Sequence, residues 1–205
     1  MAALLQKRAE MTRKKILEAA INDFSSTGPS ATTVEQIAGS AGVNKQRIYA
    51  YFGSKKKLFE AVLLEVFSES AESFKEFAAA IKPGESNITF ELSQYYQELH
   101  LQKPEFRRLL AWANLESTID PAALSAARQQ ENECLRNWFN TEQSAGRIRS
   151  EVAFESWLLT VMGTAYFASA NAKTLRNTLG ESFLSSDASQ QRSSDLAKIF
   201  SNVNN

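Results

Sequence analysis

The sequence predicts an all-α fold of about nine helices, in which a small amino-terminal three-helix domain precedes a larger helical domain. Apolar residues recur at helical spacing in almost every segment of the 205 residues, and no strand-like alternation persists. The eight glycines and four prolines lie mostly where one such segment gives way to the next. A hydrophobic content of 43% and a charged content of 22% are ordinary for a globular protein.

The first two helices are expected over residues 12–26 and from Thr33 onward. In the first helix, one face collects apolar residues at helical spacing: Ile16, Leu17, Ala20, Ile21 and Phe24. Gly28 and Pro29 end this helix. Thr33 and Gln36 form the T-x-x-Q pattern of a capping box, which marks the start of the second helix.

A sharp turn and two further helix starts follow. Gly42 suits the left-handed conformation that turns the chain, and Asn44 can cap a third helix of about two turns that reaches Tyr51. Ser54 can cap a long fourth helix over residues 55–80. A helix, a glycine turn and a short polar helix in this order are typical of a helix-turn-helix unit.

The remaining helices are expected at about 88–101, 105–117, 121–143, 151–172 and 189–202. Residues 173–188 contain Gly180 and a serine pair, and they form the least regular segment of the sequence. We expect one helical turn in it, around residues 175–179.

The net charge of zero conceals an uneven distribution. Residues 1–60 hold 10 Lys/Arg and 5 Asp/Glu, whereas residues 61–205 hold 13 Lys/Arg and 18 Asp/Glu. A basic amino-terminal part joined to an acidic remainder is expected when only one end of a protein meets a polyanion.

Several classes of protein are disfavoured. Residues 1–8 lack the apolar segment of a signal peptide, and the longest uncharged run, residues 156–172, contains Gly163 and hydroxyl side chains, so we interpret it as a buried helix and not a membrane span. The single cysteine, Cys134, suits the cytoplasm and excludes a cysteine-based zinc site. One histidine and the lack of a phosphate loop, a nucleophile elbow or an H-E-x-x-H motif argue against an enzyme, so no catalytic residue, metal or cofactor is predicted.

The short third helix carries the side chains expected to read DNA. In a helix-turn-helix, the first turns of the second helix touch base edges in the major groove. Lys45 and Arg47 can donate to guanine, and Gln46 can pair with adenine. The other candidate contacts are helix caps, tyrosines that can reach phosphates, and lysines that open the next helix: Thr33, Asn44, Tyr49, Tyr51, Lys55 and Lys56.

The lysines of residues 55–57 support this interpretation. Each cation in the first turn of a helix is unfavourable by roughly 0.3–1 kcal/mol when exposed, unless the site meets an anion such as a phosphate. Single polar residues on short helices are usually only solvated, so two alternatives stay open: a helical small-molecule-binding protein, and a nonspecific DNA binder whose helix-turn-helix does not read sequence. The basic residues before Ile16 either lie along DNA or form a solvated tail.

A distinctive set of residues extends over residues 12–62: Ile16-Leu17, Ala19-Ala20, Phe24, Gly28, Thr33-Val34, Ile37-Ala38, Ala41-Gly42-Val43, Tyr49, Phe52, Ser54-Lys55 and Leu58-Phe59. This set resembles the DNA-binding domain of the tetracycline-repressor (TetR) family of bacterial regulators. The resemblance implies that Tyr49 and Lys55 match common phosphate contacts and that residues 44–47 match the base-reading turn. Gln46 and Lys56 depart from the family pattern, which often has a small residue and usually has an acid at these positions.

The resemblance implies a homodimeric, ligand-responsive transcriptional regulator, which we expect to be a repressor released from operator DNA by a small molecule. Residues 1–57 would form the helix-turn-helix DNA-binding domain, and residues 58–205 the helical ligand-binding and dimerisation domain. Aromatic and polar residues of the middle helices are candidate contacts for the small molecule, although core or surface residence also explains each one: Tyr95, Tyr96, His100, Phe106, Trp112, Asn114, Glu116 and Trp138.

The dimer interface is expected on the last two long helices, which in the family form a four-helix bundle with those of the partner subunit. The candidate interface residues share an apolar stripe on these helices: Phe154, Trp157, Leu158, Val161, Met162, Ala165, Leu196, Ile199 and Phe200. The alternative is that the stripe is only core within one chain.

Overall fold

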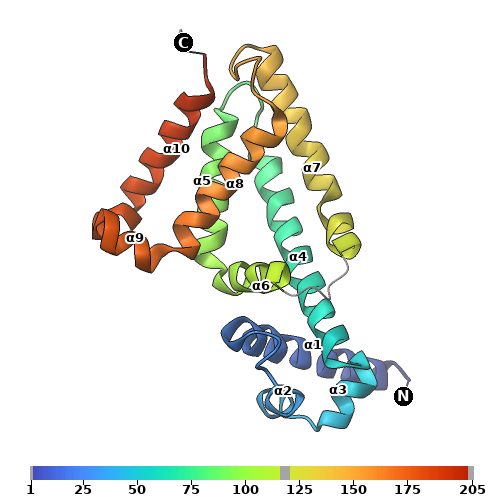
Figure 1. The fold of residues 1–205 in the computed structure, drawn as a ribbon. Coiled ribbons are helices and arrows are strands. Elements are labelled where there is room, and N and C mark those ends of the chain that lie inside the picture. The colour runs from blue at the N-terminus through green and yellow to red at the C-terminus, as the bar shows by residue number, and fades with distance from the viewer. Residues whose placement is uncertain (1, 116–120, 203–205) are drawn as a thin grey trace. The chain divides into compact units, whose positions relative to one another are not determined.

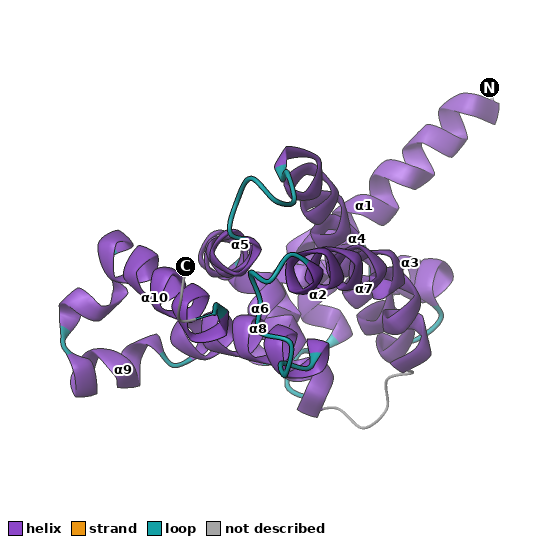
Figure 2. Cartoon of the chain, turned by 90° about the horizontal axis from the view of Figure 1, so that it is seen from above, coloured by secondary structure: helices purple, strands orange, loops and turns teal. Residues whose placement is uncertain are grey.

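The computed structural model describes residues 2–115 and 121–202, and the regular elements among them are helices (Figure 1). No strand interrupts these helices in the described residues (Figure 2). They comprise ten α-helices, one more than the approximate number predicted, and the all-α fold is confirmed. The described residues of 1–70 and 105–127 group into one compact unit, and those of 71–104 and 128–205 into a second. The domain boundary after residue 57 stays a prediction.

The first unit contains the three amino-terminal helices: α1 (Ala2–Thr27), α2 (Val34–Ala41) and α3 (Lys45–Phe52). It also contains α4 (Lys55–Ala80) as far as Ser70, and α6 (Pro104–Leu115) from Glu105. The apolar faces predicted from helical spacing are buried in it: Ile16, Leu17, Ala20, Phe24, Val34, Ile37, Ala38, Ile48, Phe52, Leu58 and Phe59.

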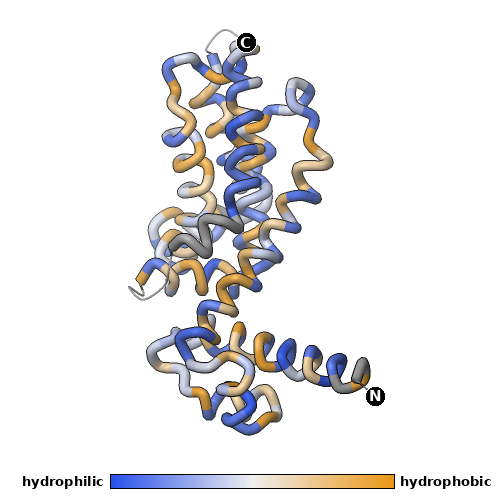
Figure 3. The backbone as a smooth tube through the Cα atoms, turned by 90° about the vertical axis from the view of Figure 1, so that its right-hand side faces the viewer, coloured by the Kyte–Doolittle hydropathy of each residue, from blue (hydrophilic) through white to orange (hydrophobic). Residues whose placement is uncertain are grey.

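Helix α1 starts ten residues earlier than predicted, so the basic residues before Ile16 are helical. The segment before Thr12 has no glycine or proline and consists mainly of strong helix formers. Apolar spacing does not reveal this part because the buried face begins only at Ile16. The early turns project from the buried part of α1 as a helical arm (Figure 3).

The second unit is built around α5 (Ile88–Gln102). Helix α5 packs against α8 (Phe154–Ala170) and against α10 (Ser186–Phe200) (Figure 1). Helix α7 (Pro121–Ser144) contributes its residues from Arg128 onward, and α4 contributes its last turns. In the core between α5 and α8, the fully buried Trp157 indole donates to the Thr89 hydroxyl over 2.9 Å.

A buried polar layer joins α5 to α10. Ser193 donates to Ser93 over 2.8 Å, and the side-chain amides of Gln94 and Gln97 donate to Ser193 over 2.6 and 2.8 Å. Both serines are fully buried, and buried polar groups are generally hydrogen bonded. Matched hydrogen bonds therefore set the alignment of α5 with α10 in addition to apolar contacts.

The segment between α8 and α10 is more regular than predicted. The single expected turn is a two-turn helix, α9 (Ala172–Leu179), followed by a 3-10 helix, η1 (Glu181–Leu184). Helix α10 begins three residues early because the Ser185 hydroxyl caps it, accepting the Ala188 N–H over 3.2 Å. Helix α8 begins three residues late because the chain still turns at Val152, whose N–H donates to the Arg149 carbonyl.

One buried carboxylate joins three segments of the second unit. Glu142, near the end of α7, is only 2% exposed and accepts hydrogen bonds from Arg147 Nε over 2.7 Å and Nη2 over 2.9 Å. It also accepts the Gly84 N–H over 3.2 Å, in the turn after α4. A buried charge is strongly destabilising when its partner is lost, so this turn and the end of α7 depend on one another.

We expect Gly28→Ala to lower the free energy of unfolding by about 1–3 kcal/mol, because it combines backbone strain with overpacking. Gly28 ends α1 with a φ of +84°, which residues with a side chain rarely adopt. A Cβ atom there would lie only 2.6 Å from Cζ2 of Trp112. Urea unfolding followed by circular dichroism measures the change.

Gly39→Ala is the matched control. Gly39 lies within α2, and a Cβ atom there would meet nothing within 4 Å. Alanine at this position should raise the free energy of unfolding by about 0.5–1 kcal/mol, because glycine loses more backbone freedom in a helix. A Gly28→Ala variant as stable as the wild type would show that Trp112 and the turn relax without cost.

Candidate functional site

The helix-turn-helix is held by the cap and the turn that the sequence predicts. The Gln36 N–H donates to the Thr33 hydroxyl over 3.1 Å, and the Thr33 N–H donates to the Gln36 side chain over 2.7 Å. Gly42 has a φ of 64° and a ψ of 35°, and the Val43 N–H closes the turn on the Ala38 carbonyl over 3.0 Å. These local bonds set the direction in which α3 leaves α2.

Helix α3 has one buried and one open face. Ile48 and Phe52 are buried, at 1% and 7% exposure, as their spacing predicts. The Asn44 side-chain oxygen caps the helix by accepting the Arg47 N–H over 3.0 Å, so Asn44 has a structural task in the free protein. The other predicted DNA contacts on this helix lie exposed: Lys45, Gln46, Arg47, Tyr49 and Tyr51.

Lys45 forms an ion pair that sequence analysis missed. Its Nζ lies 2.9 Å from Oε1 of Glu35, in the first turn of α2, and both side chains are largely exposed. The hydrogen bond, reinforced by charge attraction, lowers the pKa of Glu35 and raises the pKa of Lys45. The only hint of this ion pair in the sequence is that Glu35 is an acid in the first turn of α2. A contact between Lys45 and a base requires this ion pair to open.

The three lysines at the start of α4 are not equivalent. The Lys55 Nζ donates to the Thr32 carbonyl over 3.1 Å, so its side chain lies along the loop before α2. The Lys56 side chain is 59% exposed and has its nearest carboxylate 3.9 Å away. The Ser54 hydroxyl caps the helix by accepting the Lys57 N–H over 3.1 Å. Lys56 is therefore more available to an external phosphate than Lys55 is.

Three of the candidate ligand contacts come together in the second unit. Tyr95, Tyr96 and Trp138 form an aromatic cluster with Phe74 and Phe77 from the last turns of α4. Tyr95 stacks on Phe77 with ring centroids 4.5 Å apart, and Trp138 lies 5.9 Å from Phe74. The sequence shows Phe74 and Phe77 only as part of the apolar face of α4, since their partners are distant along the chain.

A half-buried acid borders this aromatic cluster. The Tyr96 hydroxyl donates to Oε1 of Glu131 over 2.7 Å. Burial raises the pKa of Glu131, although the hydrogen bond from Tyr96 opposes that shift. Burial and the nearby Glu131 carboxylate raise the pKa of Tyr96 and of the Cys134 thiol. The pair thus offers a hydrogen-bonding group among apolar rings. Sequence analysis missed Glu131 because spacing along α7 does not show which face is buried.

The other candidate ligand contacts are not part of this cluster. His100 is buried on α5 in the second unit, where its ring lies 5.6 Å from that of Tyr166. Phe106, Trp112 and Asn114 belong to the first unit, and the first of these is buried. Glu116 lies outside the described residues.

Most of the candidate dimer residues are core within the single chain. Six are at most 8% exposed: Phe154, Trp157, Val161, Ala165, Leu196 and Phe200. Leu158 and Met162 are half-buried, and Ile199 is 57% exposed. Helix α8 also exposes two apolar residues that the predicted stripe omits, Leu159 at 73% and Phe167 at 58%. The helical stripe alone does not separate core from interface, because α5 covers part of it.

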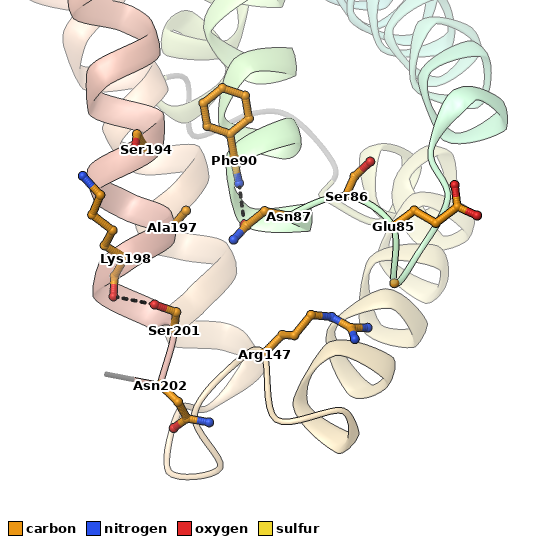
Figure 4. Close-up of a pocket in the computed structure, with 11 residues that line it drawn as sticks. Glu85, Ser86, Asn87, Phe90, Arg147, Ser194, Ala197, Lys198, Ser201 and Asn202 are labelled. Carbon is orange, nitrogen blue, oxygen red and sulfur yellow. Dashed lines mark hydrogen bonds between the residues drawn. The ribbon is translucent and has the colours of Figure 1, made fainter. Parts of the chain in front are cut away.

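A separate hollow of about 490 Å³ lies in the second unit, between the turn at residues 84–87 and the end of α10 (Figure 4). Two cations border it, and each has an acidic partner. Arg147 is paired with Glu142, and the Lys198 Nζ lies 3.2 Å from Oδ1 of Asp195. None of the predicted contacts lines this hollow.

The described residues also bear on metal binding and membrane insertion. They contain no group of three or more His, Cys, Asp or Glu side chains placed to hold a metal ion. No helix among them is both long and apolar enough to cross a membrane.

Comparison with known proteins agrees with this geometry. Residues 16–62 match the family model described as bacterial regulatory proteins, tetR family, and residues 92–196 match the one described as tetracyclin repressor-like, C-terminal domain. The chain is 29% identical over 201 residues to the HTH-type transcriptional repressor NicS of Pseudomonas putida. This alignment covers 96% of the present chain and 92% of NicS. The chain is also 30% identical over 164 residues to the HTH-type transcriptional regulator RutR of Escherichia coli K12, in an alignment that covers 76% of this chain and 75% of RutR.

The fold is also similar to solved structures. A TetR family transcription regulator from Marinobacter aquaeolei VT8 has a TM-score of 0.73 at 21% identity, over 94% of this chain and 96% of that one. The second family match spans about half of the sequence, and the first covers the helix-turn-helix built by α2 and α3. This protein therefore belongs to the TetR family of DNA-binding transcriptional regulators, which are not enzymes.

Proposed function

We propose that this protein is a repressor whose α3 reads an operator and whose aromatic cluster in the second unit holds the small molecule that releases it. Regulators of this family bind operator DNA, dimerise and bind small-molecule ligands. The observation that carries the DNA part is the open face of α3, where Lys45, Gln46 and Arg47 are exposed while Ile48 and Phe52 are buried.

The polar row of α3 suits base recognition. Gln46 is exposed, and a glutamine amide can bond adenine N6 and N7 in the major groove. Lys45 can donate to guanine once it leaves Glu35, and the free energy of that ion pair is then part of the cost of binding. Lys56 is placed to meet a phosphate beside the recognition helix.

The effector proposal rests on the aromatic cluster. Small-molecule sites combine apolar walls with a few fixed polar groups, and here the rings of Phe77, Tyr95 and Trp138 lie near the Tyr96–Glu131 pair. An effector with a flat apolar part and a hydrogen-bond donor fits these groups. Binding must favour one conformation of the repressor over another, or operator affinity would not change.

Selection of bound fragments from the genome of the source organism tests the operator proposal. Recovery of a roughly palindromic sequence, bound at least a thousandfold more tightly than random DNA, is the expected result, since specific sites usually exceed nonspecific ones by about that ratio or more. Equal affinity for selected and random DNA would leave only a nonspecific binder. A thermal-shift screen of metabolites, followed by release of the selected fragment, tests the effector.

Lys56→Glu should weaken binding of the selected fragment and of random DNA alike. The substitution removes a phosphate contact and adds repulsion. The slope of log K against log salt concentration should therefore become less steep, by about one. Binding titrations at several salt concentrations measure it. Lys75→Glu makes the same charge change further along α4 and should have no such effect. An unchanged salt dependence in Lys56→Glu would exclude the contact.

We propose that the exposed apolar residues Leu159 and Phe167 of α8 belong to the dimer interface. The double substitution Leu159→Glu and Phe167→Glu should then convert the dimer to monomers, because it would bury charges in an apolar interface. Sedimentation velocity measures the mass, and operator affinity should fall with it since two half-sites are no longer bound together. Leu101→Glu is the control, as Leu101 on α5 is equally exposed at 73%. A dimer that persists in the double variant would place the interface elsewhere.

Glu131→Gln should stabilise the protein at neutral pH. The pKa of Glu131 is raised in the folded state, so its ionisation opposes folding, and stability falls as pH rises from about 4.3, the unfolded value, through the folded pKa. Glutamine keeps an acceptor for Tyr96 without the charge. Urea unfolding from pH 4 to pH 8 measures the free energy of unfolding of both proteins. The two values should converge at the low end of this range, where the pH is roughly the pKa of an unperturbed carboxyl. Glu133→Gln, at an exposed neighbour, should leave the wild-type profile unchanged; parallel profiles for Glu131→Gln would contradict the assignment.

A further inference from the structure

A basic groove lies beside the recognition helix in the first unit. It has a volume of about 620 Å³ and is formed by one face of the helical arm of α1 and one face of α3. The residues that line it come from successive turns of each helix, at positions 8, 9, 11, 12 and 15 on α1 and at positions 47, 50 and 51 on α3. The groove is therefore a product of two helix faces that meet, and not of a mobile loop.

The charge of this groove is of one sign. Arg8 and Lys15 come from α1 and Arg47 comes from α3, and no acid is among the lining residues. None of the three cations forms an ion pair within the described part of the chain. Neighbouring lysines differ, since Lys14 lies 3.9 Å from Glu18 and Lys45 lies 2.9 Å from Glu35. Three uncompensated cations in one hollow favour a polyanion.

The position of the groove is held by contacts of the same two helices. The Arg13 guanidinium lies over the Phe52 ring at 5.4 Å, so α1 is joined to the end of α3. Arg13 thus contacts Phe52 and does not line the groove, whereas Arg8 and Lys15 do. Tyr51, 37% exposed, adds a hydroxyl on the α3 wall.

We propose that this groove receives the sugar-phosphate backbone of the DNA strand that borders the major groove occupied by α3. The proposal rests on the proposed function, and it assigns Arg8, Lys15 and Arg47 to phosphates. Arg47 is then a backbone contact, and base reading falls to Lys45 and Gln46. Because phosphates carry no sequence information, the groove adds affinity to every DNA sequence equally and orients α3 on the duplex.

The test is the double substitution Arg8→Gln and Lys15→Gln in the full chain, with a random-sequence duplex and the selected genomic fragment as probes. Each lost phosphate contact makes the negative slope of log K against log salt concentration less steep by about 0.9. The slope of the double variant should therefore be less steep than that of the wild type by about two. Affinity for both probes should fall by the same factor, roughly tenfold or more at low salt. Circular dichroism should be unchanged, since both side chains are exposed.

Two controls separate the groove from general charge. Lys14→Gln removes one charge beside Lys15 on a different face of α1, and it should leave the slope unchanged. The variant Arg8→Lys with Lys15→Arg keeps both charges and should keep the wild-type slope. An unchanged slope in the glutamine variant overturns the proposal, as does an equal effect of Lys14→Gln, or a loss confined to the genomic fragment, which would indicate base reading.

The outcome is independent of whether the protein reads sequence. A wild-type protein that prefers no genomic fragment would defeat the proposed operator function, while the groove would still change the salt dependence on random DNA. Conversely, a specific repressor whose salt dependence ignores Arg8 and Lys15 would keep its function and lose the groove.

Discussion

The left-handed turn at Gly42 is the constraint on which the DNA-facing part of the molecule depends. It ends α2, and the Val43 N–H then bonds back to Ala38 and starts the chain toward α3. A residue with a Cβ atom would be strained in this conformation, so the turn suits glycine. The exposed row on α3 and its separation from the buried Ile48 and Phe52 follow from the direction that this turn sets.

The electrostatic attraction of the DNA-facing part for DNA depends on which of its basic side chains are already paired within the protein. Lys45 is held by Glu35 over 2.9 Å and Lys55 by a backbone carbonyl, whereas Lys56 has only a longer contact with Glu60, at 3.9 Å. The cations of the groove beside α3 form no ion pair with the residues that line it. Paired cations must give up a partner before they meet DNA, and open ones need not. A count of basic residues therefore overstates the number of contacts that favour binding.

In the second unit, polar side chains hydrogen-bond mainly to one another within the protein. Glu142 with Arg147, and the serine and glutamine layer between α5 and α10, satisfy one another and fix how segments pack. The Tyr96–Glu131 pair is also hydrogen bonded, but partial burial raises the pKa of Glu131, so its charged form is held at a cost. Such a group is a candidate for a functional role, because the fold gains little from it.

The sequence by itself determined the elements that depend on near neighbours. The capping box at Thr33, the Asn44 cap, the turn at Gly42 and the buried faces of the first helices each involve residues a few positions apart, where spacing and side-chain chemistry suffice. Helix α1 was underestimated because no described side chain before Ile16 is buried, and the prediction relied on apolar residues that recur on a buried face.

Only the tertiary structure decided the contacts between residues that are distant along the chain. It paired Lys45 with Glu35, brought Phe74 and Phe77 to Tyr95, and covered Trp157 with α5. Helical periodicity shows that a face is apolar, but the partner that covers this face depends on how helices cross. For that reason the predicted interface stripe turned out to be largely core, and the exposed apolar residues on α8 became visible only in the fold.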